Sequence, residues 1–135
     1  MSGTIYQAKH AQGNSIEGEC LSASDGFSAR YDLDRLQGVF SRPAHKLFGQ
    51  SYKDKILVLD AAKGGVASAW MLYEMKYRNL CPLAIIFNAA NPILAQGAAH
   101  ADIPMLSGFN CDITQAIKSG SRLRIDTNKQ TVEVL

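Results

Sequence analysis

The sequence has few of the features that mark membrane, secreted or nucleic-acid-binding proteins. None of its apolar runs approaches the ~18 residues that a membrane-spanning helix needs, and its first 16 residues are polar, without the apolar stretch of a signal peptide. The 14 Lys and Arg and 12 Asp and Glu leave a net charge of only +2, and the basic residues are scattered singly. We therefore expect a cytoplasmic protein that binds neither membranes nor nucleic acids.

Cysteine is scarce as well. Cys20, Cys81 and Cys111 are far apart, and none belongs to a CxxC pair, which fits a reducing compartment. Three thiols could ligate an iron–sulfur cluster, but the apolar neighbours of Cys20 and Cys81 favour buried, inert thiols. No HExxH motif, nucleophile elbow or EF-hand loop is present either. We expect no metal site in this chain.

What the sequence does contain is enough apolar material for one core. Hydrophobic residues make up 47% of the 135 residues and charged residues only 19%, which excludes a disordered chain. The length is typical of one domain, and no internal repeat or linker interrupts it. We expect a single domain that spans residues 1–135.

The residue pattern predicts an α/β fold. Ile16–Ser22 reads as a strand, followed by a turn and by a second extended piece, Phe27–Asp32. Lys55–Asp60 is a continuous apolar run, typical of a strand that is covered on both faces. Val66–Arg78 reads as a helix that ends before Pro82, and Leu83–Phe87 as another buried strand. We expect this strand–helix–strand unit to be a right-handed parallel crossover.

The C-terminal third continues and closes this fold. We expect a short helix over Ile93–Ala99, begun by Pro92, and a third parallel strand over Ile103–Leu106. A helical turn is expected within 112–118, and a closing hairpin has the strands Arg122–Asp126 and Thr131–Leu135. The fold class is therefore α/β, with a parallel βαβ core joined to an antiparallel β portion.

The turn Lys63–Gly65, between a buried strand and a helix, is the most informative local motif. Glycines let a ligand approach the backbone closely, and the unpaired N–H groups and the dipole of a helix N-terminus attract anions. With the ammonium of Lys63, this turn forms a plausible cradle for a carboxylate or phosphate. The alternative is a tight turn that needs glycine only for its geometry, and the local sequence supports both readings equally.

Two other groups of polar residues deserve comparison with this turn. Within Gly26–Asp32, alternate positions of a strand edge would present Ser28, Arg30 and Asp32 to one side. Taken alone, however, the segment is better explained as an exposed strand with a surface ion pair. The histidines His10, His45 and His100 lie far apart, with no carboxylate at metal-ligand spacing, so we expect them to be surface or structural residues; these three do not suggest a metal site.

Taken together, several segments resemble the swivel-domain family of aconitase X. They are Gly26–Asp32, the apolar run that ends at Asp60 with its glycine turn, Cys81–Ile86, Gly97–Pro104 and the segment HKLFGQS at His45–Ser51, which matches the family pattern His-x-Leu-x-Gly-x-Ser. The resemblance extends over about Ile16–Leu135. It implies a swivelling β/β/α domain, in agreement with the fold class above.

The resemblance also implies a function. Such domains are fused to, or form the small subunit beside, a large aconitase-like chain whose cysteines hold an iron–sulfur cluster. The family eliminates water from small hydroxy acids. We expect cis-3-hydroxy-L-proline, which yields Δ1-pyrroline-2-carboxylate, as the substrate, with a phosphorylated mevalonate as the alternative. The chain would be the small subunit of a hydro-lyase, would bind no cofactor by itself, and would be inactive alone.

One departure from the family concerns the catalytic position. Members commonly carry the turn Gly-Ser-Ser-Ser-Gly-Ser, whose first serine is regarded as the proton acceptor, and an ungapped alignment puts that serine at Gly65. The next hydroxyl is that of Ser68. Lys63 and Gly64, with Ser28 and Arg30, would then bind the substrate carboxylate. The family's Ser-Phe-Trp-Gly-Gly-Val-Asp stretch also gains the cation of Arg30 here, which suggests an altered substrate or catalytic assignment.

A different class of function is also consistent with a swivelling β/β/α domain. Such domains also serve as phosphohistidine carriers, and His45 would then be the residue that carries the phosphoryl group. A stand-alone small enzyme is disfavoured, because the chain offers no complete set of acid, base and metal ligands.

Overall fold

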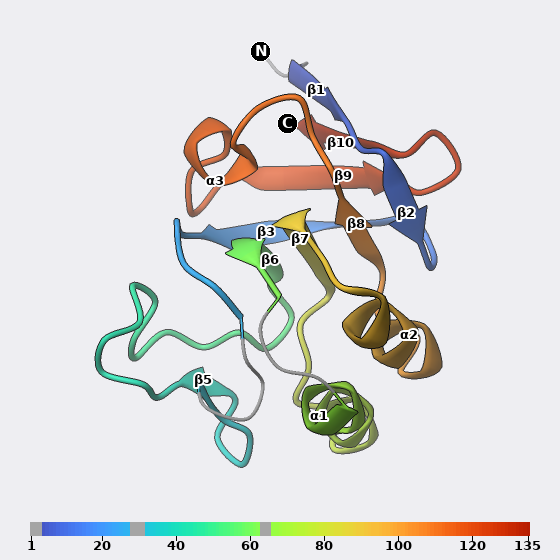
Figure 1. Cartoon of the computed structure of the whole chain (residues 1–135). Helices are drawn as coiled ribbons and strands as arrows, with labels where there is room; N and C mark the ends of the chain where they lie inside the picture. The colour runs from blue at the N-terminus through green and yellow to red at the C-terminus, as the bar shows by residue number, and fades with distance from the viewer. Residues whose placement is uncertain (1–3, 28–31, 63–65) are drawn as a thin grey trace.

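The computed structural model describes residues 4–27, 32–62 and 66–135, the last range beginning with three residues of which only the backbone is described. Two long-range features organise these residues, an eight-stranded sheet and a pair of helices on one of its faces (Figure 1). The strands are β1 Thr4–Gln7, β2 His10–Gln12, β3 Ile16–Ser22, β4 Leu33–Asp34, β5 Val39–Phe40, β6 Ile56–Ala61, β7 Ala84–Ala89, β8 Met105–Ser107, β9 Arg122–Asp126 and β10 Thr131–Val134. The helices are α1 Val66–Tyr77, α2 Pro92–His100 and the short α3 Ile113–Ala116.

The large sheet has the strand order β1-β10-β9-β3-β6-β7-β8-β2. The four central strands β3, β6, β7 and β8 are parallel to one another, whereas β9, β10 and β1 run antiparallel on one side and β2 on the other. Helices α1 and α2 form the crossovers from β6 to β7 and from β7 to β8. The expected α/β fold, a parallel βαβ core combined with an antiparallel portion, is confirmed.

The two edge strands of this sheet are neighbours in the chain. β1 pairs with β10 at one end of the strand order and β2 pairs with β8 at the other, yet only Ala8 and Lys9 separate them. Two extended residues span roughly 10 Å at most, so the two ends of the sheet must come together. The sheet therefore curls into a barrel-like shape, and the N-terminal segment covers edges that would otherwise be open to pairing with other chains.

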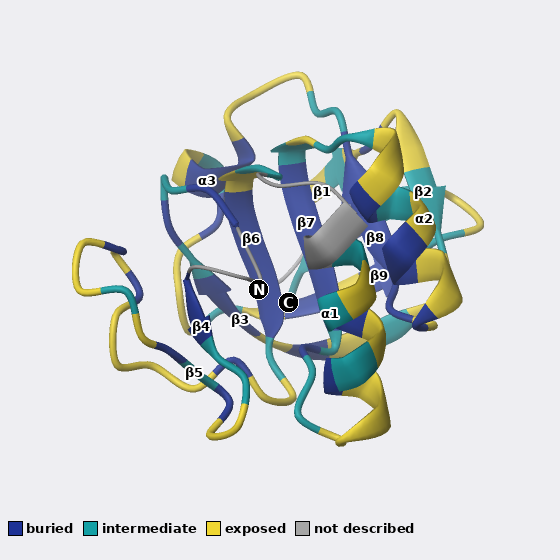
Figure 2. Cartoon of the chain, turned by 60° about the horizontal axis from the view of Figure 1, so that its bottom comes forward, coloured by how far each residue is buried: buried dark blue, intermediate teal, exposed yellow. Residues whose placement is uncertain are grey.

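Alternating residues of the central strands bury both faces of the sheet. Ile56 and Val58 of β6 belong to a core cluster inside the curled sheet, whereas Leu57 and Leu59 belong to a second cluster under α1 and α2. Strand β7 alternates in the same way, and Figure 2 shows β6 and β7 as buried along most of their length. The prediction that the run up to Asp60 is a strand covered on both faces is confirmed.

Helix α2 begins as the sequence predicted and lies unusually close to α1. Asn91 caps it by accepting a hydrogen bond from the Leu94 N–H (2.7 Å), and Pro92 occupies the first turn. A Cβ at Gly97 would lie 2.5 Å from Cβ of Ala69 and 2.6 Å from its Cα. Glycine at this position is therefore what allows the two helix backbones to approach each other.

Within the described chain, no helix has both the length and the apolar character to cross a membrane.

Two sequence expectations differ from the structure. Strands β1 and β2 were not predicted, because they are short edge strands without an apolar alternation that would reveal them. The extended piece expected over Phe27–Asp32 is recognisable only at its start, where Phe27 forms an isolated bridge with Ala62. Residues 28–31 of that piece lie outside the described residues.

The close approach of α1 and α2 yields a first prediction. Gly97→Ala should lower the free energy of unfolding by about 1–3 kcal/mol, because the added methyl group would overlap with Ala69. Urea denaturation of both proteins would measure the difference. The neighbouring exposed substitution Gln96→Ala is the control and should change little. Equal stability of Gly97→Ala and the parent chain would contradict the close packing.

Candidate functional site

Two of the candidate segments leave the sheet from adjacent positions. Phe27 and Ala62 form a parallel bridge, and the Phe27 N–H donates a hydrogen bond to the carbonyl oxygen of Ala61 (2.9 Å). The segment that contains Ser28 and Arg30 follows directly after Phe27. The turn Lys63–Gly65 follows directly after Ala62. Ser28, Arg30, Lys63, Gly64 and Gly65 lie outside the described residues. The residues that directly precede the two segments, Phe27 and Ala62, are paired at the carboxyl end of β6.

Ser68, the remaining candidate, is the third residue of α1, and its side chain is not described. The first turn of this twelve-residue helix contains no acidic residue. An acidic side chain there would neutralise the positive end of the helix dipole, so its absence suits an anion. Binding of an anion at this turn nevertheless stays a prediction.

Asn88, at the end of β7, joins three elements at the same edge of the sheet. Its Nδ2 donates hydrogen bonds to Oδ1 of Asp60 (3.0 Å) and to Oδ1 of Asp112 (2.7 Å), and its Oδ1 accepts one from the Ile113 N–H (2.8 Å). The side chain thereby ties the ends of β6 and β7 to the start of α3. Sequence reasoning missed Asn88, although a polar residue directly after the buried run that ends at Phe87 was a usable signal.

Asp112 caps α3 and carries a negative charge at this edge. Its Oδ1 accepts hydrogen bonds from the hydroxyl (2.6 Å) and the N–H (3.0 Å) of Thr114. The Thr114 hydroxyl and the Asn88 amide outweigh desolvation and lower the pKa of Asp112 below its ordinary value. Among the described residues, the carboxylates of Asp60 and Asp112 thus lie near the carboxyl ends of β6 and β7, joined by the Asn88 amide.

A second polar group surrounds the segment Gly26–Asp32. Asp32 is only 3% exposed, and its Oδ1 accepts a hydrogen bond from Nε of Arg42 at 2.5 Å. The other end of the Arg42 guanidinium lies 3.6 Å from Oδ1 of Asp25. The surface ion pair expected for this segment is therefore wrong at Asp32, which is buried and paired with a residue ten positions further along the chain.

His45 lies beside the same two aspartates and is fully buried. Its Nδ1 accepts a hydrogen bond from the Leu47 N–H (3.0 Å), so its Nε2 carries the proton and donates it to the carbonyl oxygen of Gly26 (2.9 Å). The ring also stacks on Phe40, with centroids 4.7 Å apart. With both nitrogens engaged and no exposed surface, this histidine is poorly suited to carry a phosphoryl group. It is a structural residue, as the sequence analysis expected.

Asp25 keeps its charge in this partly buried position. Desolvation opposes ionisation, but the N–H groups of Gly26 and Lys46 donate to the carboxylate, and His45 and Arg42 lie nearby. Together these interactions lower the pKa of Asp25 below its ordinary value. The guanidinium of Arg42 consequently faces two carboxylates, those of Asp25 and Asp32. The sequence analysis did not single out Arg42.

The other sequence candidates are scattered. His10 lies on β2 and His100 at the end of α2, both exposed, as surface residues should be. Cys20 is buried with its Sγ 3.3 Å from the Lys118 carbonyl oxygen, Cys81 is half-buried and Cys111 is exposed. Among the described side chains, no three His, Cys, Asp or Glu groups converge on a metal position. That the chain binds no cofactor by itself stays a prediction.

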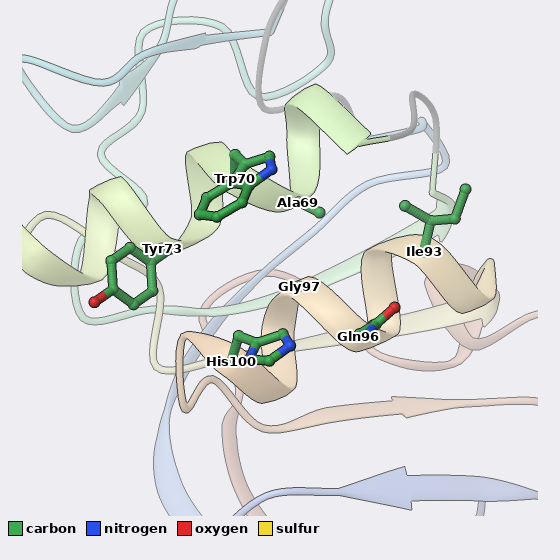
Figure 3. A pocket seen from close by; sticks show the side chains of 7 residues that line it. All are labelled: Ala69, Trp70, Tyr73, Ile93, Gln96, Gly97 and His100. Atoms are coloured by element: carbon green, nitrogen blue, oxygen red, sulfur yellow. The ribbon is translucent and has the colours of Figure 1, made fainter.

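A hollow of about 290 Å³ lies between α1 and α2, and His100 is one of the residues that line it. Figure 3 shows Trp70 and Tyr73 on α1 facing Gln96 and His100 on α2. Trp70 is 68% exposed. Among the described residues that line the hollow, no carboxylate is available to pair with the His100 imidazole. The hollow therefore lacks the paired acid and base that an elimination reaction requires.

The chain matches known proteins over nearly its whole length. The family model of the aconitase X swivel domain matches residues 5–134. A relative named phosphomevalonate dehydratase small subunit, from Methanococcoides burtonii, is 34% identical over 88% of this chain and 87% of its own. A relative of the same name from Thermococcus kodakarensis is 33% identical over 91% of this chain and 90% of its own.

A solved structure shares the fold. The crystal structure of Thermococcus kodakaraensis aconitase X in its holo-form superposes with a TM-score of 0.89 at 31% identity, covering 98% of this chain and 99% of that one. It therefore shares the overall fold of this chain. From the matched family model, these relatives and this shared fold, we conclude that the chain belongs to the aconitase X swivel-domain family.

Proposed function

We propose that this chain is the small subunit of an aconitase X-type dehydratase and that its substrate is a phosphomevalonate. The relatives that span about nine tenths of the chain are named phosphomevalonate dehydratase small subunits. The hydroxyproline substrate that the sequence analysis favoured has no such support, so its alternative, the phosphorylated mevalonate, takes its place. The large, aconitase-like subunit is the partner that the relatives' names imply.

The pairing of Phe27 with Ala62 is the observation that carries this proposal. Residues 28–31 and 63–65, the two segments with candidate substrate ligands, directly follow these paired residues in the chain. Phosphomevalonate carries a carboxylate and a phosphate, so its site needs several cations or N–H donors. Lys63, Arg30 and the N-terminus of α1 are the groups that supply them here.

The charge of the surrounding edge restricts where the anion can bind. Asp25, Asp60 and Asp112 line the described part of this edge, and Arg42 already faces two carboxylates. These carboxylates would repel the carboxylate and the phosphate of the substrate at short range. It is therefore expected to contact the turn at Gly64 and the start of α1 rather than the ends of β7 and α3.

The reaction itself needs a base for the proton next to the carboxylate and an electrophile for the leaving hydroxyl. The iron–sulfur cluster, expected in the large subunit, would supply the electrophile. This chain would hold the substrate carboxylate through Lys63, Gly64, Ser28 and Arg30. Gly65 stands where the family's serine is expected, so the proton acceptor is either the Ser68 hydroxyl or a group of the large subunit.

Reconstitution is the first test. Neither this chain nor the large subunit alone should consume phosphomevalonate, whereas the assembled pair should release water from it, as followed by ³¹P NMR of the substrate and product. The physical reason is that each chain supplies only part of the ligand set. The same complex incubated with cis-3-hydroxy-L-proline should show at least tenfold lower kcat/KM. Turnover by this chain alone, or a preference for hydroxyproline, would contradict the proposal.

The glycine turn is the second test. Lys63→Ala should lower kcat/KM of the assembled enzyme about ten- to a hundredfold, because a charge-assisted hydrogen bond at a partly desolvated site is worth roughly 1.5–3 kcal/mol. Gly65→Val should lower it as well by blocking close approach of the substrate. Lys129→Ala, on the exposed turn between β9 and β10, is the control and should leave the rate unchanged. Full activity of both turn variants in an assembled complex would show that the turn is structural.

Restoring the family's residue is the third test. Gly65→Ser should raise kcat if a hydroxyl at this position acts as the proton acceptor, since the substitution adds the missing base. It should lower kcat/KM if the substrate lies against the glycine backbone and the hydroxyl crowds it. Steady-state kinetics of Gly65→Ser and of Ser68→Ala test which residue acts as the base. Ser68→Ala should lower kcat only if the Ser68 hydroxyl is the proton acceptor.

A further inference from the structure

Arg42 and His45 contact both ends of the segment Gly26–Asp32, outside the set of residues that the proposed function uses. At the first end, Nε2 of His45 donates to the Gly26 carbonyl oxygen at 2.9 Å. At the second end, the Asp32 carbonyl oxygen accepts hydrogen bonds from the N–H groups of Ser41 (2.8 Å) and Arg42 (3.3 Å). One short stretch, residues 41–45, thus holds both ends of the segment that contains Ser28 and Arg30.

The side chains add a charged bridge between the same two ends. The Arg42 guanidinium reaches Asp32 through Nε (2.5 Å) and Asp25 through its NH2 nitrogen (3.6 Å). Nε2 of His45 lies 3.9 Å from one carboxylate oxygen of each aspartate. Asp25 and Asp32 flank the segment, so these contacts draw its two ends toward one guanidinium and one imidazole. We call Asp25, Asp32, Arg42 and His45 the aspartate clamp.

Burial makes the clamp a strong constraint. The side chain of Asp32 is 4% exposed and that of His45 is fully buried, whereas Arg42 is one-third exposed. A buried carboxylate is tolerated only when it is paired and hydrogen-bonded. Without the guanidinium, the carboxylates of Asp25 and Asp32 would lose the cation that lies between them.

The clamp is also connected to the turn of the proposed substrate site. Gly26, which accepts the bond from His45, directly precedes Phe27, and Phe27 pairs with Ala62 at the end of β6. Asp60 also donates its N–H to the Asp25 carbonyl oxygen at 2.8 Å. The clamp therefore holds the residues that precede Phe27 at the end of β6.

We propose that Arg42 and His45 are positioning residues, which hold Gly26 and Asp32, the two ends of the segment that contains Ser28 and Arg30, and thereby support the part of this segment in substrate binding. This inference rests on the proposed function. It assigns a role to two residues that contact no substrate and act only through the backbone and carboxylates of the segment. A misplacement of about 1 Å in such a segment is enough to lower the rate about a hundredfold.

The test uses the assembled complex and three variants of the clamp. Arg42→Gln, which cannot neutralise either aspartate, should lower kcat/KM with phosphomevalonate about ten- to a hundredfold. Arg42→Lys keeps the charge but offers no planar fork to span two carboxylates, so its loss should be smaller. His45→Gln retains a donor for the Gly26 carbonyl oxygen and should be milder than His45→Leu, which removes it.

A matched control separates positioning from general destabilisation. Arg35 lies in the same part of the chain, and its guanidinium pairs with Glu74 of α1 at 2.8 Å. Arg35→Gln should therefore leave kcat/KM within about twofold of the parent enzyme. If Arg42→Gln does not fold, Arg42→Lys and the two His45 variants carry the test.

A second readout does not depend on activity. Amide hydrogen exchange of Phe27, whose N–H is bonded to the Ala61 carbonyl oxygen, should accelerate at least tenfold in Arg42→Gln and His45→Leu but not in Arg35→Gln. An inactive parent complex would overturn the proposed function, and unchanged exchange at Phe27 would independently overturn the clamp. An active parent complex in which Arg42→Gln and His45→Leu keep full kcat/KM would overturn the positioning role alone.

Discussion

The structure depends on how strand β3 divides its backbone hydrogen bonds. Its first four residues, Ile16–Glu19, pair antiparallel with β9, and its last three, Cys20–Ser22, pair parallel with β6. One strand thus joins the antiparallel portion to the parallel core. Since the chain after β3 runs on to Phe27 and its bridge with Ala62, the same strand also brings the candidate substrate segments to the end of β6.

Electrostatics complements this constraint at the carboxyl edge of the sheet. The N–H groups of Gly26 and Lys46 hold the carboxylate of Asp25, whereas Asp60 and Asp112 share the amide of Asn88 as their donor. The Asn88 amide thereby ties the ends of β6 and β7 to the start of α3. The Arg42 guanidinium joins Asp25 to Asp32.

Much of the fold could be predicted from sequence because its elements have strong local signals. Strands β3 and β9 have the predicted bounds, α1 ends one residue earlier than predicted, and α2 is one residue longer at each end. These segments bury a continuous apolar face or follow a clear capping residue such as Asn91. Strands β1 and β2 have neither signal, because both are short edge strands without an apolar alternation. Their place follows only from the curling of the whole sheet.

The site divides along the same line. The sequence by itself determined the family resemblance and the α/β class, because glycine, proline and apolar periodicity act over a few residues. It left His45 as a surface or structural residue or as a phosphoryl carrier, and anion binding at the turn Lys63–Gly65 stays a prediction. Only the tertiary structure decided that Asp32 is buried against Arg42 and that Asn88 spans two carboxylates. Such contacts join residues from different elements, and side-chain pairing across elements depends on how the strands and loops pack, which no local pattern records.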